Sequence, residues 1–243
     1  MPVEAPAEET PAWPRDGGPR YIETPEFDPG PQLIIEPWNG ASAALFVAVA
    51  VFWIVRLRGR YRQFPFLCIS LPILLVGGVG GTLYHATRSS RVWFLMDVIP
   101  INLLGAVVSV FLWFQLGPKL RYLIGMVGIL GLIQVLGQLN LPRQWAINLS
   151  YASLALIVLV PLVLVLIKTR FRFGGWVATA FACFAIAWFF RIADATIHPP
   201  LLPMGSHWLW HVFGACCTLS LSYYFFLLER EKAERKALTA NAA

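Results

Sequence analysis

Seven long apolar segments, separated by short polar stretches, restrict what this sequence can fold into. Each is about 18–25 residues long, the length of helix needed to cross ~30 Å of hydrocarbon. In lipid every backbone polar group must be satisfied internally, so such segments form helices. The sequence therefore predicts an all-α membrane protein, a bundle of seven transmembrane helices. The segments are 40–57, 64–84, 92–116, 122–139, 145–167, 173–190 and 208–228.

The composition supports this class and argues against another. Hydrophobic residues make up 58% of the chain and charged residues 13%, which is far from the composition of an ordinary soluble domain. The chain is basic, with a pI of about 9.4. Its Lys and Arg residues fall in short runs between the apolar segments, where such runs set membrane topology. We therefore expect a membrane protein that does not bind nucleic acid.

The distribution of charge predicts three regions and an orientation. Residues 1–37 form a polar, Pro-rich tail without the features of a cleaved signal peptide, 38–228 a seven-helix domain, and 229–243 a charged tail. On the side of the C-terminus lie 13 Lys and Arg residues, and on the other side 6. The positive-inside rule therefore predicts a cytoplasmic C-terminus and an N-terminus outside.

Three histidines flank the predicted spans at one end of the bundle. His85 ends the second span, and His207 and His211 begin the seventh. Because His207 and His211 are four residues apart, they share a helix face and lie about 6 Å apart along its axis. Asp97 lies about 9 Å into the third span from the same side. The remaining histidine, His198, lies between the sixth and seventh spans, and we expect it at the surface.

These residue types point to metal chemistry. An acid inside a span costs about 2.5–3.5 kcal/mol on insertion scales, so Asp97 needs a function or a partner. Three histidines that leave the fourth position of a tetrahedral Zn²⁺ open form a catalytic rather than a structural site, and the metal lowers the pKa of bound water to about 7. Asp97 would accept a proton from that water or hold the water in line. Alternatively, the histidines hydrogen-bond between helices and Asp97 pairs with backbone or arginine. We expect Asp194, three residues after Arg191, to pair with that arginine.

Four sequence motifs together resemble the alkaline ceramidases and their bacterial relatives. Residues 81–87 (GTLYHAT), followed by 95–97 (LMD), are similar to the family's motif in helices 2 and 3. Residues 206–211 (SHWLWH) are similar to its helix 7 motif. Residues 36–39 (EPWN) and 190–194 (FRIAD) resemble its segments at the start of helix 1 and the end of helix 6. The resemblance therefore extends from the first span to the seventh.

The resemblance implies a seven-helix zinc hydrolase of the superfamily that includes the adiponectin receptors. His85, His207 and His211 fall on the family's zinc ligands, and Asp97 falls on its water-orienting acid. It implies hydrolysis of the N-acyl amide bond of a lipid such as ceramide, a sphingolipid, which enters sideways from the bilayer. A bacterial member of this family would lie in the plasma (inner) membrane.

Two departures from the family pattern bear on catalysis. The family has a serine four residues before its first histidine, a position held here by Gly81, and the spacing from His85 to Asp97 is one residue longer. The hydroxyl of Thr82 or Tyr84 could replace the serine, and Thr82 is our candidate catalytic residue beside Asp97. If the missing hydroxyl limits the rate, Gly81→Ser is expected to raise it.

The resemblance also implies a Ca²⁺ site near the N-terminus. Glu36 matches one calcium-ligand position of the family, and Glu23 is a candidate for another. Arg20 and Pro25 fall where further ligands are expected. Alternatively these acids belong to a solvated tail, in which Asn39 caps the first helix.

Two other functions remain open from the sequence. A non-catalytic seven-helix receptor or scaffold could keep the metal for structure, and Gly81 favours this alternative. A haem protein would place one histidine on each face of the ring, which leaves either His207 or His211 without a role.

Overall fold

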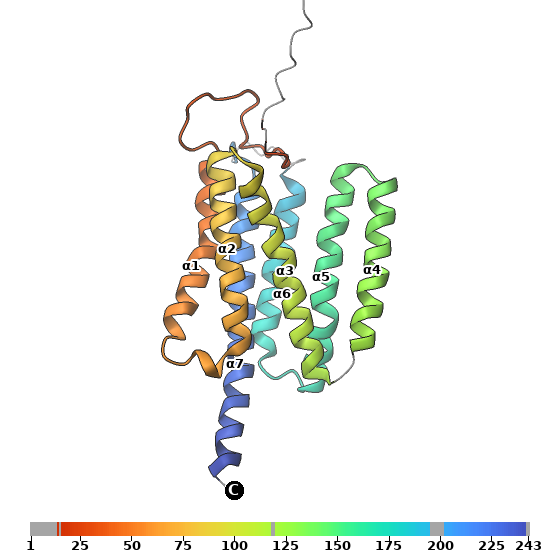
Figure 1. Cartoon of the computed structure of the whole chain (residues 1–243). Coiled ribbons are helices and arrows are strands. Elements are labelled where there is room, and N and C mark those ends of the chain that lie inside the picture. The colour runs from red at the N-terminus through yellow and green to blue at the C-terminus, as the bar shows by residue number, and fades with distance from the viewer. Residues whose placement is uncertain (1–13, 15, 118–119, 195–201, 242–243) are drawn as a thin grey trace, which may run out of the picture.

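The structure, a computed structural model, describes residues 14, 16–117, 120–194 and 202–241, and in these it is helical without strands (Figure 1). Seven of its helices are long and apolar enough to cross a membrane, which confirms the predicted helix bundle. They are α1 (Pro37–Arg56), α2 (Pro65–Thr87), α3 (Arg91–Leu116), α4 (Leu120–Asn140), α5 (Arg143–Lys168), α6 (Gly174–Ala193) and α7 (His207–Asn241), with a short 3₁₀ turn, η1 (Tyr61–Gln63), before α2.

The helices divide into a compact group and an outlying pair. α1 packs on α2 and α7, α2 packs on α3, and α6 packs on α7. On the other side α5 packs on α3, and α4 packs mainly on α5 at the edge of the bundle, as Figure 1 shows. The inner faces of five helices, α2, α3, α5, α6 and α7, therefore surround the middle of the molecule.

Glycines bring α2 close to both of its neighbours. A Cβ atom on Gly78 would lie 2.8 Å from the backbone nitrogen of Val47 in α1, and a Cβ on Gly80 would meet the backbone of Met96 in α3. Small residues of this kind allow helix backbones in membranes to approach closely. The close packing fixes α2, and with it His85, between α1 and α3.

Part of the buried apolar core lies at the end of the bundle away from the histidines. Trp53 and Leu57 of α1, Phe64 before α2, and Phe226 of α7 are all buried there. The rings of Phe64 and Phe226 stack with centroids 4.8 Å apart. This core ties the helices together at one end and leaves the other end available for polar groups.

α7 is longer than the sequence predicted, because it continues beyond 228 to Asn241 and projects past the other helices (Figure 1). The added turns carry ion pairs at i,i+4 spacing, between Arg230 and Glu234 and between Glu231 and Arg235. Such pairs and the good helix formers of this segment stabilise an exposed helix. As far as Asn241, the predicted charged tail is thus a continuation of the last helix.

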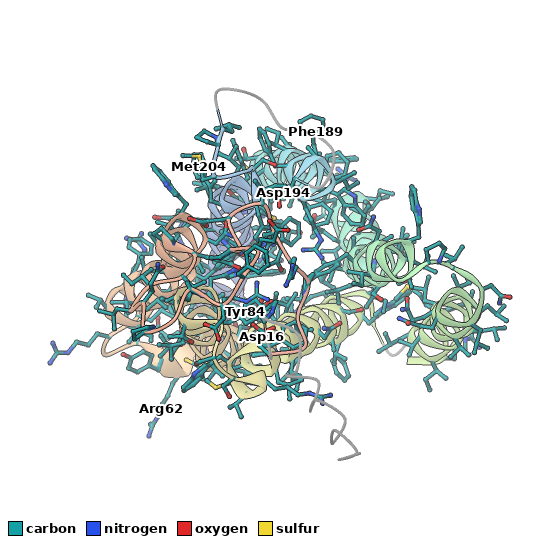
Figure 2. The ribbon with its side chains drawn as sticks, turned by 90° about the horizontal axis from the view of Figure 1, so that it is seen from above. Asp16, Arg62, Tyr84, Phe189, Asp194 and Met204 are labelled. Atoms are coloured by element: carbon teal, nitrogen blue, oxygen red, sulfur yellow. The ribbon has the colours of Figure 1, made fainter. Side chains whose placement is uncertain are left out.

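The N-terminal segment lies over the end of the bundle that carries the histidines. Asp16 is fully buried, and Figure 2, which views the bundle from that end, places it beside Tyr84 near the middle of the helices. Arg62, by contrast, points outward from the periphery. The described part of the predicted polar tail is therefore folded onto the helices rather than solvated as a whole.

Candidate metal centre

The three histidines predicted from the sequence come together. Each offers one ligand atom, and these atoms all lie within 4.8 Å of one another. The ring of His85, in the last turn of α2, lies 4.8 Å from that of His211 and 5.3 Å from that of His207, centroid to centroid. All three side chains are buried. Among the described residues, this group could hold a metal ion.

Hydrogen bonds fix which nitrogen of two histidines is available. His85 Nδ1 donates to Glu36 Oε2 at 2.6 Å, since an ionised carboxylate can only accept. Ser42 Oγ donates to the carbonyl of Asn39, so it accepts from His211 Nδ1, 3.0 Å away. In both rings Nε2 is then the nitrogen whose lone pair is free.

Two buried ring nitrogens have no hydrogen-bond partner in the protein, namely Nε2 of His85 and Nδ1 of His207. Buried polar atoms are nearly always satisfied, so two such atoms within one cluster require an explanation. A metal ion bound by neutral imidazole nitrogens would satisfy free lone pairs. The donor set and its unsatisfied atoms therefore fit a metal ion.

His207 is positioned from three directions. Oδ1 of Asp194, which follows α6, accepts the backbone N–H groups of Ser206 at 2.6 Å and His207 at 2.9 Å, and so caps the start of α7. Gly205 has a φ of +77°, and a Cβ there would lie 2.5 Å from this Asp194 oxygen. The ring of Tyr21 stacks on that of His207 with centroids 3.8 Å apart.

These contacts correct one prediction from the sequence. Asp194 does not pair with Arg191 in the structure, because its carboxylate serves backbone N–H groups at the start of α7. A carboxylate is well suited to cap a helix N-terminus, whose first four backbone N–H groups have no partner within the helix, both through hydrogen bonds and through the helix dipole. His198, predicted at the surface, lies outside the described residues.

A buried carboxylate supports His85 from behind. Glu36 Oε2 accepts from His85 and from Asn39 Nδ2, while Oε1 accepts from Thr24 Oγ1 and Arg88 Nη1, both at 2.6 Å. Burial raises the pKa of Glu36, but the hydrogen bond from His85 and the charge of Arg88 outweigh it and lower the pKa to about 2. An ionised Glu36 holds the His85 ring in one tautomer, as outer-shell carboxylates do at metal sites.

Arg88 links this carboxylate to the N-terminal segment. Its guanidinium donates to Glu36 and, through Nε at 2.6 Å and Nη2 at 3.1 Å, to Asp16. Burial lowers the pKa of Arg88, yet the hydrogen bond to Asp16 and the charge of Glu36 raise it overall. Asp16, Arg88 and Tyr21 could not be predicted as part of the site, because nothing in the local sequence shows that the N-terminal segment returns to α2.

The two candidate calcium ligands have partners within the protein. Glu23 accepts the backbone N–H groups of Trp38 at 2.7 Å and Asn39 at 2.9 Å, which caps α1. Burial raises the pKa of Glu23, and these two hydrogen bonds oppose that rise. Glu36 pairs with the guanidinium of Arg88, which also pairs with Asp16 and so places a positive charge between these two carboxylates. Calcium binding stays a prediction.

Asp97 lies on the wall of a cavity next to the histidines. The cavity has a volume of about 330 Å³, and its lining includes His207 and His211. It continues along the helices past Leu104 of α3 and Thr218 of α7, where its walls are mostly apolar. This combination of an apolar chamber and a few convergent polar groups is typical of a small-molecule site.

The space that a side chain at position 81 would need is taken by the carboxylate of Asp97. A Cβ atom on Gly81 would lie 2.6 Å from Oδ1 of Asp97. A serine at position 81 would therefore push the Asp97 carboxylate aside, and the expectation that Gly81→Ser raises activity loses its basis. The structure gives a steric reason for glycine at the position where the family has serine.

The two hydroxyls proposed as substitutes for the serine lie against other parts of the protein. Thr82 Oγ1 donates to the carbonyl of Gly78 at 2.7 Å, within its own helix. The Tyr84 hydroxyl is buried and lies against Gly18 of the N-terminal segment. A catalytic role of Thr82 stays a prediction, and it would require this hydroxyl to turn away from Gly78.

A further polar pair in the cavity, Arg191 of α6 and Tyr151 of α5, was not predicted as part of the site. The predicted span ended at residue 190, so Arg191 was placed just outside it; in the structure it lies in the last turn of α6, where an ionisable residue within a span is a functional candidate by default. The expected pairing with Asp194 also concealed this candidate.

No protein-family model matches the chain, and no curated protein matches it significantly. The resemblance to alkaline ceramidases therefore depends on the motifs in the sequence.

Proposed function

We propose that the protein is a zinc-dependent amidase that works within the membrane and hydrolyses the N-acyl amide bond of a lipid such as ceramide. The observation that carries the proposal is the meeting of three buried histidines beside Asp97 at one end of an apolar cavity. The motifs that resemble alkaline ceramidases support the same chemistry.

His85, His207 and His211 would hold the ion. Imidazole ligands suit Zn²⁺, and three protein ligands leave a fourth position for water or substrate, as in catalytic zinc sites. When bound, the ion would polarise the acyl carbonyl and make water a better nucleophile. Glu36 and Ser42 would keep the His85 and His211 rings oriented through their Nδ1 atoms.

Asp97 would act as the proton carrier. As the oxygen of water forms a bond to the acyl carbon, an oxygen of Asp97 accepts the proton that water loses. The proton then passes to the nitrogen of the leaving amine as the C–N bond breaks. Asp97 is placed for this role, because it lines the cavity together with His207 and His211.

The cavity would hold the acyl chain. From His207 to Thr218 its wall follows α7 for about 16 Å, at 1.5 Å per residue. Its deep part is lined by apolar side chains such as Ile73, Leu74 and Leu104. An acyl chain lying there would place its carbonyl at the polar end, beside the histidines.

The orientation in the membrane is part of the proposal. The histidines lie at the end of the bundle where α7 begins, and α7 ends at the opposite side. If the C-terminus is cytoplasmic, as the charge asymmetry predicts, the metal centre opens towards the outer side.

A non-catalytic receptor or scaffold is the second candidate, and Gly81 favours it. The position lacks a hydroxyl, and Asp97 lies against it instead. A bound ion in such a protein would stabilise the histidine cluster and the N-terminal segment without turnover.

The experiment that separates the two uses purified protein and a panel of N-acyl lipids. Metal content is measured by elemental analysis, and release of free fatty acid is measured before and after chelation. We expect one zinc per chain and chelator-sensitive release. A fully metal-loaded protein that hydrolyses none of the panel would favour the receptor or scaffold.

A further inference from the structure

Arg191 faces the cavity from the last turn of α6. Its guanidinium carbon lies 4.1 Å from the ring centroid of Tyr151 and 5.3 Å from that of Trp210. These two rings meet almost at right angles, with centroids 5.6 Å apart, so they form an aromatic corner. Cation–π contacts of this kind hold the guanidinium in place while they leave its N–H groups free to donate.

Arg191 forms no ion pair among the described residues, although the acid Asp97 lines the same cavity. Its Nε is buried without a hydrogen-bond partner, and the nearby acid Asp194 is engaged with backbone N–H groups. A guanidinium removed from water without an acceptor is costly, so such groups are paired or face a charged ligand. The side chain therefore lies in the cavity with its donors unused.

The helix dipole does not explain this placement. A basic residue in the last turn of a helix interacts favourably with the dipole, but an outward-facing arginine would do so equally well. Arg191 instead lines the cavity together with Tyr21 and His207 of the metal centre. Tyr21 stacks on His207, so the charge acts at the polar end of the cavity.

We propose that Arg191 binds an anionic group in the headgroup of the substrate, a carboxylate or a phosphate close to the scissile amide. This rests on the proposed amidase function and narrows its substrates from N-acyl lipids in general, of which ceramide is a neutral example, to N-acyl lipids with an anionic headgroup. The apolar part of the cavity holds the acyl chain, so a charged group at the polar end belongs to the other side of the amide. The planar fork of arginine matches carboxylate and phosphate oxygens.

Binding tests the proposal without turnover. The probes are analogues of N-dodecanoylglycine and of its uncharged glycinamide, each with CH₂ in place of the scissile nitrogen so that hydrolysis cannot occur. Affinities are measured for the unaltered protein, Arg191→Gln, Arg191→Lys and a control, Arg91→Gln. Arg91 is exposed at the start of α3, at the same end of the bundle, so the control removes the same charge outside the cavity.

We expect Arg191→Gln to weaken binding of the carboxylate analogue about 10- to 100-fold, the usual range for a charge-assisted hydrogen bond. The affinity for the neutral analogue should stay within about threefold of that of the unaltered protein. Arg191→Lys should lose less affinity for the carboxylate analogue, because lysine keeps the positive charge but lacks the planar guanidinium that binds two oxygens at once. Equal weakening of both analogues in both Arg191 variants would overturn the proposal. Dodecanoate, the hydrolysis product, is measured as a third ligand, and a loss of affinity confined to it would also overturn the proposal, because the arginine would then bind the released acid.

Turnover gives a second, separable readout. On hydrolysable N-dodecanoylglycine and its glycinamide, Arg191→Gln should lower kcat/KM for the acid and spare the amide. A similar fall in kcat for both would instead make Arg191 a stabiliser of the reacting carbonyl, against the proposal. If neither compound is hydrolysed by the unaltered protein, the amidase function fails while the binding result still decides the role of Arg191.

Discussion

Replacing Glu36 with glutamine tests the support behind the metal centre. Each carboxylate oxygen accepts two donors, Arg88 and Thr24 on one side and His85 and Asn39 on the other. Glutamine keeps the shape but turns one oxygen into an NH₂ group. That group must face either the guanidinium or the His85 N–H, and no rotation avoids the conflict.

Two effects of Glu36→Gln follow, and their sizes can be stated separately. Loss of an outer-shell carboxylate on a ligating histidine costs about 10- to 100-fold in metal affinity, or about 1.4–2.7 kcal/mol. Breaking a buried ion pair costs about 3–5 kcal/mol of folding stability, and the lower end applies because Arg88 keeps Asp16. Zinc affinity is measured by competition with a chromogenic chelator, and stability by thermal unfolding of the metal-free protein.

Glu23→Gln is the matched control for this experiment. Glu23 caps α1 through two backbone N–H groups and makes no hydrogen bond to a histidine among the described contacts. It should lose about 1 kcal/mol of stability and keep its zinc affinity. If Glu36→Gln binds zinc as tightly as the unaltered protein, the argument that Glu36 orients a ligand is refuted. Calcium titration of both variants also tests the predicted calcium site, which requires both carboxylates.

Three further substitutions separate metal binding, catalysis and stability. Asp97→Asn should retain zinc while turnover falls about 10²- to 10⁴-fold, because the amide cannot accept the proton; loss of zinc would show that Asp97 acts through the metal site instead. Gly81→Ser should displace Asp97 and lower activity about 10²-fold with zinc retained, and activity above that of the unaltered protein would contradict the steric argument. Glu229 accepts the N–H groups of Phe66 and Leu67 at the start of α2, so Glu229→Ala should lose about 1–2 kcal/mol of stability in thermal unfolding; an accompanying change in zinc affinity would show that the two ends of the bundle are coupled.

The bundle could be predicted because its signal is local. A run of apolar residues long enough to span a bilayer specifies a helix almost regardless of its neighbours. The helix ends were harder, as α7 shows: its charged extension to Asn241 continues as helix through i,i+4 pairs that a hydropathy pattern does not detect.

The candidate ligands could be predicted, but most of their support could not. His207 and His211 can be identified by their spacing on one helix, and His85 by its place at the same end of the bundle. The partners of these histidines come from segments distant in sequence. Asp16 meets Arg88 across 72 residues, and no periodicity connects them.

Arg191 and Gly81 show a different limit. Both were visible in the sequence, but the nearest explanation was a local ion pair for the first and a lost hydroxyl for the second. In the structure Arg191 faces the cavity, and the Cβ position of Gly81 is taken by Asp97. Side-chain direction, which sequence spacing alone does not give, decides between such explanations.

The most direct test of the central claim is a zinc titration of metal-free protein, with release of fatty acid from an N-acyl lipid as the readout. The account predicts that activity rises with added zinc and saturates at one equivalent per chain, and that His211→Ala recovers neither zinc binding nor activity, because two histidines hold zinc poorly. Hydrolysis that is independent of added metal, or a chain that binds one zinc and releases no fatty acid, would contradict it.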